Sequence, residues 1–122
     1  MDSNPFQSPG DKADLEHGSA ITPRFDANGL IACVATHAHS GEVLMLAWMS
    51  RETLAHTLTS GRVTYWSRSR QEAWTKGATS GNHQHLISAL VDCDGDTVLL
   101  KVDQMGPACH TGAPTCFFRR AE

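Results

Sequence analysis

The stretch LISALVDCDGDTVLLKV, residues 86–102, decides the fold of this chain. Its two apolar runs, LISALV and TVLLKV, are rich in Leu, Val and Ile, which is typical of β-strands. The acidic segment DCDGD separates the runs, so it lies in a tight connection or in a bulged strand. We therefore predict two strands joined by an acidic segment.

The segments before this stretch continue the strand pattern and add a helix. Apolar runs at Leu30–Ala35 and Val43–Trp48, separated by a polar His, Ser and Gly stretch, predict a β-hairpin with a longer loop. Ser50 is a candidate N-cap for a helix, and Gly61 can adopt the left-handed conformation that ends it. An extended pattern resumes at RVTYWSRSR. The predicted fold class is α+β, a small domain with a largely antiparallel sheet and about two helices.

Length and composition limit the possible architectures. With 122 residues and 40% hydrophobic content, the chain suits one globular domain. Residues 1–20 are polar and mix Pro, Gly and charges, so we expect a disordered leader before a domain at residues 21–122. The leader lacks the apolar core of a secretory signal, and we expect a cytoplasmic protein with reduced cysteines. A net charge of −3 and the absence of an apolar run of ~18 residues argue against nucleic-acid and membrane partners.

Three of the four cysteines are candidate metal ligands. Cys93, Cys109 and Cys116 are separated by fifteen and six residues, which matches no closed zinc-finger spacing. Three thiolates leave one tetrahedral position of zinc open, as in catalytic sites where the ion lowers the pKa of bound water. His110 can be a fourth ligand or a base for that water. The alternative is that the cysteines are small, partly buried apolar residues.

The acidic segment is a second candidate metal site. In an extended strand, Asp92, Asp94 and Asp96 would project to one face while Cys93 points to the other, which separates the two sites. Carboxylates suit a hard cation, and we prefer Mg²⁺. An EF-hand loop is disfavoured because Thr97 stands where a Gly is required and a strand pattern follows. An acidic turn that only faces water remains an alternative.

The segment from residue 65 to residue 85 concentrates groups that bind phosphate. Three side chains are cationic, several carry hydroxyls, and glycines let backbone amides approach an anion. Aromatic side chains among the cations can stack on a planar base, although they also suit a core. The overall acidity of the chain favours a phosphorylated metabolite over nucleic acid. The candidate substrate-binding residues are Trp66, Arg68, Ser69, Arg70, Lys76 and Ser80.

Several segments, taken in order, carry a family resemblance. EVLMLAWMSRETL, GRVTYWSRSR, WTKGATSGNHQ, DCDGDTVLLKV and QMGPACHTG followed by CFF resemble the successive motifs of phosphoribosyl-AMP cyclohydrolase, an enzyme of histidine biosynthesis. The similarity covers residues 25–119, and its departures at Ala73, Ala78 and Thr115 touch no candidate ligand. Some relatives are fused to a pyrophosphohydrolase domain, for which this chain has no space, so we expect a monofunctional enzyme.

The resemblance implies a reaction and a site. The reaction is the zinc-dependent hydrolytic opening of the adenine ring of 1-(5-phosphoribosyl)-AMP at the N1–C6 bond, which gives an aminoimidazole carboxamide ribonucleotide of the ProFAR type. By resemblance, Cys93, Cys109 and Cys116 hold Zn²⁺, His110 orients or deprotonates the attacking water, and the three aspartates hold Mg²⁺. A homodimer is also implied, with Cys93 from one subunit and the other two cysteines from its partner. A noncatalytic zinc-stabilised module that binds a phosphorylated metabolite remains the alternative.

Overall fold

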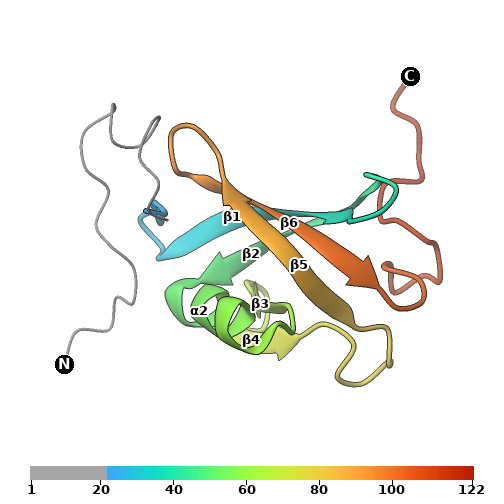
Figure 1. The fold of residues 1–122 in the computed structure, drawn as a ribbon, viewed down its shortest axis with the longest axis horizontal. Coiled ribbons are helices and arrows are strands. Elements are labelled where there is room, and N and C mark those ends of the chain that lie inside the picture. The colour runs from blue at the N-terminus through green and yellow to red at the C-terminus, as the bar shows by residue number, and fades with distance from the viewer. Residues whose placement is uncertain (1–21) are drawn as a thin grey trace.

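The computed structural model describes residues 22–122, which form a four-stranded sheet, a two-stranded hairpin and a helix (Figure 1). The large sheet has the strand order β2-β1-β6-β5, and the hairpin pairs β3 with β4. In chain order the elements are β1 (Leu30–His37), β2 (Val43–Ser50), α2 (Arg51–Ser60), β3 (Thr64–Ser67), β4 (Glu72–Thr75), β5 (Gln84–Val91) and β6 (Thr97–Gln104).

The pairing of the strands is mixed. β1 with β2, β3 with β4, and β5 with β6 are antiparallel, which confirms the hairpin and the two strands predicted around the acidic segment. The central pair, β1 with β6, is parallel. The prediction of a largely antiparallel sheet is therefore correct for most of the pairings, but the four-stranded sheet as a whole is mixed.

Local capping determines the bounds of α2. The Ser50 side chain accepts a hydrogen bond from the backbone N–H of Thr53, and the Thr53 hydroxyl accepts one from the Ser50 N–H. This reciprocal pair satisfies donors at the helix start. At the other end Gly61 adopts the predicted left-handed conformation, with φ 76°, and its N–H donates to Thr57 O. Of the about two helices expected, α2 is the one found in residues 22–122, and none there is long and apolar enough to cross a membrane.

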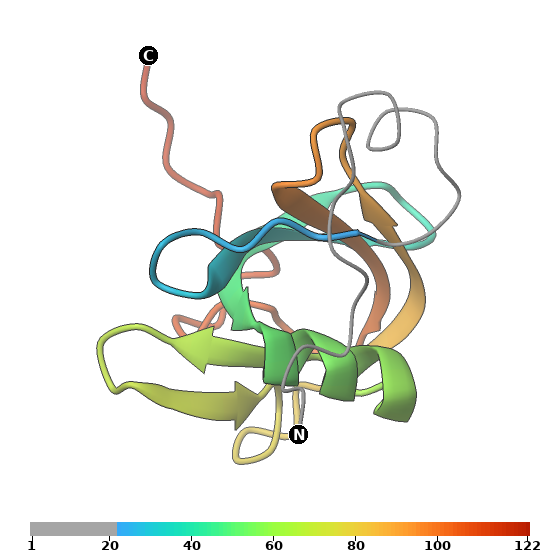
Figure 2. The ribbon, with the colours of Figure 1, turned by 90° about the vertical axis from the view of Figure 1, so that its left-hand side faces the viewer.

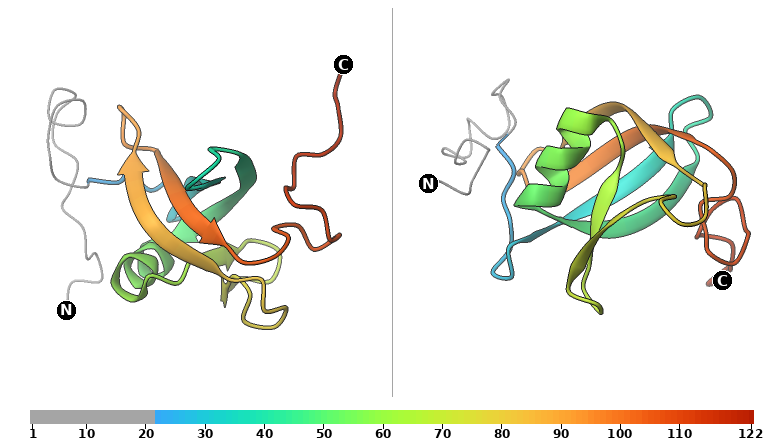
Figure 3. Two further views of the ribbon diagram at one scale, coloured as in Figure 1. Left: turned by 45° about the vertical axis from the view of Figure 1, so that its right-hand side comes forward. Right: turned by 90° about the horizontal axis from the view of Figure 1, so that it is seen from below.

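α2 and the β3–β4 hairpin lie on the same side of the four-stranded sheet (Figures 2 and 3). The sheet turns alternate residues toward them, so that Cys33 and Ala35 of β1 are buried beside Val98 and Leu100 of β6. Burial of these apolar side chains holds the layers together. The core contains Ile31, Cys33, Ala35, Leu44, Met45, Met49, Leu54, Val63, Tyr65, Val98, Leu100, Val102 and Ala108.

A chain of polar side chains crosses this core. The buried Tyr65 hydroxyl donates to Gln84 Oε1 at 2.6 Å, and Gln84 Nε2 donates to Gln104 Oε1 at 2.8 Å. Gln104 Nε2 in turn donates to the Asn82 carbonyl oxygen at 3.4 Å. Because buried polar groups cost free energy when unpaired, these hydrogen bonds tie the hairpin to β5, to β6 and to the segment before β5.

The strand directions give the sheet two chemically different ends. β1 and β6 start together, and β2 runs the opposite way, so the starts of β1 and β6 meet the end of β2. The acidic turn, residues 92–96, lies there, and we call this the acidic end. The ends of β1 and β6 meet the start of β2 beside residues 105–116, and we call this the cysteine end. In Figure 1 the acidic end is on the left and the cysteine end on the right.

Candidate active site

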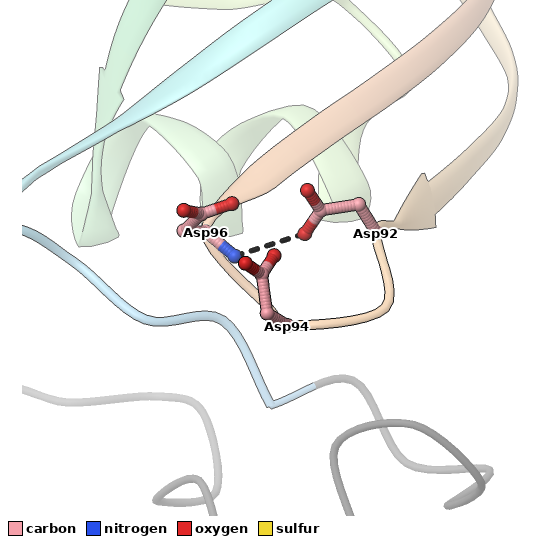
Figure 4. A group of neighbouring side chains, drawn as sticks. All are labelled: Asp92, Asp94 and Asp96. Atoms are coloured by element: carbon pink, nitrogen blue, oxygen red, sulfur yellow. Dashed lines mark hydrogen bonds between the residues drawn. The ribbon is translucent and has the colours of Figure 1, made fainter. Parts of the chain in front are cut away.

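Three carboxylates converge at the acidic end. Asp92, Asp94 and Asp96 each place a carboxylate oxygen within 4.8 Å of the others (Figure 4). Within residues 22–122, no other group of three or more His, Cys, Asp or Glu side chains brings its ligand atoms this close together. The segment is a turn, which confirms the tight connection, whereas the alternative of a strand face is wrong. Asp92 Oδ1 accepts the backbone N–H of Asp96 at 3.0 Å, and this bond curls the chain so that the carboxylates meet.

The three carboxylates perturb one another. Hydrogen bonds with Asp96 and Asp92 raise the pKa of Asp94 above its ordinary value, and the hydrogen bond with Asp94 lowers the pKa of Asp96. The three negative charges repel one another, and a cation among them would relieve that repulsion. The atoms that this cluster offers to a metal are exposed carboxylate oxygens, which are the ligands that a hard cation such as Mg²⁺ prefers.

Two of the three predicted zinc ligands meet at the cysteine end. The thiols of Cys109 and Cys116 lie near enough to shift each other's pKa, and the Thr111 hydroxyl donates to Cys109 Sγ at 3.0 Å. The backbone N–H of Cys116 donates to Leu44 O at 2.7 Å, which fixes this segment against the start of β2. The pair supplies two soft sulfur donors, the type that zinc prefers.

The two thiols differ in acidity. The hydrogen bond from Thr111 lowers the pKa of Cys109, with smaller contributions from Cys116 and from the positive charge of Lys76. Desolvation raises the pKa of Cys116, and the neighbouring Cys109 thiol adds to that effect. Cys109 is therefore the thiol of the pair that ionises first and is the stronger candidate for the first metal bond.

Cys93 lies at the opposite end of the sheet. It is exposed in the acidic turn before β6, whereas Cys109 follows β6. A strand of this length, at about 3.3 Å per residue, separates its two ends by more than about 20 Å. A single chain thus brings together Cys109 and Cys116 but does not bring Cys93 to them.

A cavity of about 780 Å³ opens beside the cysteine pair. The Lys76 ammonium lines it and donates to the Ala108 carbonyl oxygen at 2.5 Å, next to Cys109. Arg70 also lines it and forms an exposed ion pair with Glu72 at 3.5 Å. The volume lies within the range of about 300–1,000 Å³ that small-molecule sites occupy. The candidate site residues in its lining are Arg70, Lys76, Ser80, Cys109, His110 and Cys116.

Comparison with known proteins identifies the family. The family model for phosphoribosyl-AMP cyclohydrolase matches residues 45–118, which is more than half of the chain. This chain belongs to the phosphoribosyl-AMP cyclohydrolase family. A phosphoribosyl-AMP cyclohydrolase of Hyphomonas neptunium is 54% identical over 118 residues, which cover 97% of this chain and 90% of the relative. The enzyme of Streptomyces griseus is 54% identical over 117 residues, which cover 96% of this chain and 93% of the relative. That of Rhodospirillum centenum is 59% identical over 96 residues, which cover 79% of this chain and 72% of the relative.

Membership in the phosphoribosyl-AMP cyclohydrolase family confirms the sequence-based resemblance and the prediction of an enzyme, specifically a hydrolase. The matched residues include the acidic turn, all three candidate zinc cysteines and residues 105–116 at the cysteine end. The two clusters described above therefore belong to the part of the chain that defines the family.

The phosphoribosyl-AMP cyclohydrolase fold divides the predicted basic residues between two places. Arg70 and Lys76 line the cavity beside the cysteine pair, whereas Trp66 and Arg68 line another cavity next to the start of α2. Ser69, at the exposed turn of the hairpin, lies outside both cavities.

Sequence reasoning did not find Arg51 or Gln71, which line the cavity that holds Arg68. Arg51 directly follows the predicted helix cap, and that signal places it at the first turn of α2. Its proximity to the hairpin depends on tertiary packing, which the pattern of the sequence does not contain.

Proposed function

We propose that this enzyme opens the adenine ring of 1-(5-phosphoribosyl)-AMP by zinc-dependent hydrolysis, as a step of histidine biosynthesis, and that residues 21–122 form its catalytic domain. In this reaction water adds to C6, the N1–C6 bond breaks, and N1 takes up a proton. The name shared by the family model and the relatives supports the substrate. The observation that carries the proposal is the adjacent pair of thiols, Cys109 and Cys116, in the wall of a cavity of nucleotide size.

The donor set of this cavity fits zinc and a hydrolytic reaction. Cys109 has a lowered pKa, so it supplies a thiolate readily, and Cys116 lies beside it. Zinc, when bound, lowers the pKa of water toward ~7 and makes it a nucleophile at neutral pH. His110 lines the same cavity, where it is placed to orient that water or accept its proton.

We propose that the third thiolate, Cys93, comes from a second copy of the chain, so that the enzyme is a homodimer with shared zinc sites. The separation of Cys93 from Cys109 by the length of β6 supports this arrangement. A two-fold axis near the middle of the sheet would bring the acidic end of one copy to the cysteine end of the other, twice. Each of the two sites would then contain three cysteines.

An apolar row on the sheet supports association through the face opposite α2. In this row Leu46 of β2 pairs with Val34 of β1, Val34 pairs with Leu99 of β6, and Leu99 pairs with Leu90 of β5. Leu46 and Leu90 are 51% and 47% exposed. Four adjacent apolar side chains at a half-exposed sheet face are the kind of surface that a second copy buries.

The acidic turn is proposed to hold Mg²⁺ through Asp92, Asp94 and Asp96, close to the zinc site that includes Cys93. Its role would be to offset the negative charge of a substrate phosphate. Arg70, Lys76 and Ser80 are proposed to contact substrate, because all three line the cavity beside the cysteine pair.

Turnover of 1-(5-phosphoribosyl)-AMP by the purified, zinc-loaded protein tests this function. Mild chelation should abolish turnover while the circular dichroism of helix and sheet persists, and zinc should restore activity. Addition of Mg²⁺ alone to the chelated protein is the control and should not restore it. Absence of turnover by the zinc-loaded protein would refute the function. A collapse of the dichroism together with zinc loss would instead assign the metal a structural role.

A further inference from the structure

A cavity of about 580 Å³ lies between the start of α2 and the β3–β4 hairpin. We call it the arginine cavity, because two guanidinium groups from different elements line it. Its lining includes Ser50, Arg51, Glu52, Trp66, Arg68 and Gln71. None of the zinc-site residues belongs to it, since those lie at the cysteine end or in the acidic turn.

Arg51 has an unused donor at this cavity. Its Nε atom is buried and has no hydrogen-bond partner within residues 22–122. The guanidinium carbon lies 4.5 Å from the centroid of the Phe25 ring, and this stacking restricts the orientation of the group. A buried guanidinium donor without a partner costs free energy, which an acceptor on a ligand would recover.

Arg68 is held at the same cavity by its own contacts. Its guanidinium carbon lies 4.7 Å from the centroid of the Trp48 ring. Gln71 has a positive φ of 54°, and in the described part of the chain it is the one residue other than glycine that does. Its Nε2 donates a hydrogen bond to the Arg68 carbonyl oxygen at 2.6 Å. Unusual backbone conformations of this kind concentrate at binding sites, where surrounding contacts maintain them. Gln71 thereby fixes the backbone from which Arg68 reaches the cavity.

Neither arginine has its charge neutralised in the described part of the chain. The ion pairs there join Arg70 to Glu72 and Arg120 to Glu122, and neither Arg51 nor Arg68 lies within 4.0 Å of a carboxylate. Glu52 is the acidic residue in the lining, so two cations face one anion and the cavity retains a positive charge. Planar guanidinium groups match the oxygens of phosphate, with which they form paired hydrogen bonds.

The arginine cavity lies at the acidic end of the sheet. It shares Leu30 with a smaller cavity that contains Asp96 of the carboxylate cluster, together with Arg24 and Trp48. The backbone N–H of Arg24 also donates to Gly95 O at 2.7 Å, which ties this region to the acidic turn. A phosphate in the arginine cavity would therefore lie on the side of the molecule where the hard-cation site is.

We infer that the arginine cavity binds one of the two 5′-phosphates of the substrate, while Arg70 and Lys76, which line the cavity beside the cysteine pair, bind the other. This inference rests on the proposed function, which supplies a substrate with a phosphate on each ribose. In the shared-site dimer the acidic end of one copy meets the cysteine end of its partner, so each active site contains both phosphate-binding regions. The division of the basic residues between two cavities thus matches the two ends of the substrate.

Charge-removing substitutions test the assignment. Arg51→Gln and Arg68→Gln should each raise the KM for 1-(5-phosphoribosyl)-AMP by about tenfold or more, because each removes a charge-assisted hydrogen bond. Zinc content should be unchanged, and kcat should change less than KM. Arg68→Lys keeps the charge but loses the paired geometry, so its effect should be intermediate. Arg62→Gln, at an exposed arginine whose side chain lines neither cavity, is the matched control and should behave as wild type.

Calorimetric titration with ribose 5-phosphate gives a readout that does not depend on turnover. Binding should weaken by about tenfold in the Arg51→Gln, Arg68→Gln double variant, and remain unchanged in the Arg62→Gln control. If the wild type turns over its substrate and both KM and ribose 5-phosphate binding ignore the two substitutions, the phosphate assignment is wrong and the proposed function stands. If ribose 5-phosphate binding requires both arginines but no turnover occurs, the phosphate site stands and the proposed function is wrong. If Arg51→Gln lowers the melting temperature, the KM and ribose 5-phosphate binding of Arg68→Gln alone test the phosphate assignment, because Arg68 is exposed.

Discussion

Mixing two inactive variants tests the shared zinc site, because the structure assigns the candidate ligands to opposite ends of β6. In a Cys93→Ala homodimer both sites lack the ligand from the acidic end. In a Cys109→Ala homodimer both sites lack a ligand from the cysteine end. In a mixed dimer one site lacks both ligands and the other is complete. We therefore expect two inactive parents to give an active mixture.

The size of the recovered activity follows from two-fold symmetry. Random reassembly of equal amounts of the two variants makes about half of the dimers mixed, and each mixed dimer has one of its two sites intact. Activity should then approach about a quarter of the wild-type value, and bound zinc should rise in parallel. The pair Cys109→Ala with Cys116→Ala is the matched control. These two thiols lie on the same half of the site, so their mixed dimer contains no complete site and should stay inactive.

The assay requires reversible dissociation and refolding with zinc present, and wild-type protein carried through the same steps sets the scale. Substrate turnover and zinc content are measured on each refolded sample. Sites built within single subunits predict no recovery from either mixture. If the wild type recovers while the Cys93→Ala and Cys109→Ala mixture stays at the level of its parents, the shared-site dimer is wrong.

Three further predictions follow from individual side chains. Cys33 is fully buried, and burial raises its pKa to about 12. Cys33→Ser should therefore lower the melting temperature in calorimetry but keep the zinc content and the turnover per folded protein. Stoichiometric zinc loss would contradict the ligand assignment. Asp94→Asn should weaken the response of turnover to Mg²⁺ and leave zinc bound, as metal analysis would show; loss of both metals would contradict two separate sites. The Thr111 hydroxyl lowers the pKa of Cys109, so the thiolate forms at lower pH. In zinc-free protein, Thr111→Val should raise that pKa and slow the alkylation of Cys109 near neutral pH. An unchanged alkylation rate would contradict the role of the hydroxyl.

Local features of the fold could be predicted from the sequence because they depend on neighbouring residues. The helix begins at the Ser50 cap and ends at Gly61, as predicted, since capping requires side chains and backbone within one turn. The acidic segment between two strands forms the predicted tight connection for the same reason. The family resemblance also followed from the sequence, because long motifs in a fixed order are read along the chain.

Contacts between distant segments were decided only by the tertiary structure. The parallel pairing of β1 with β6 joins segments more than sixty residues apart, and no local pattern specifies that partner or its direction. The pairing also gives the sheet its two ends, and the length of β6 places Cys93 at one and Cys109 at the other. The β3–β4 hairpin likewise carries Arg68 to one cavity and Arg70 to another, although the sequence shows them as one basic cluster. Arg68 and Arg70 carry the same guanidinium group, but the packing of the layers determines which cavity each side chain reaches.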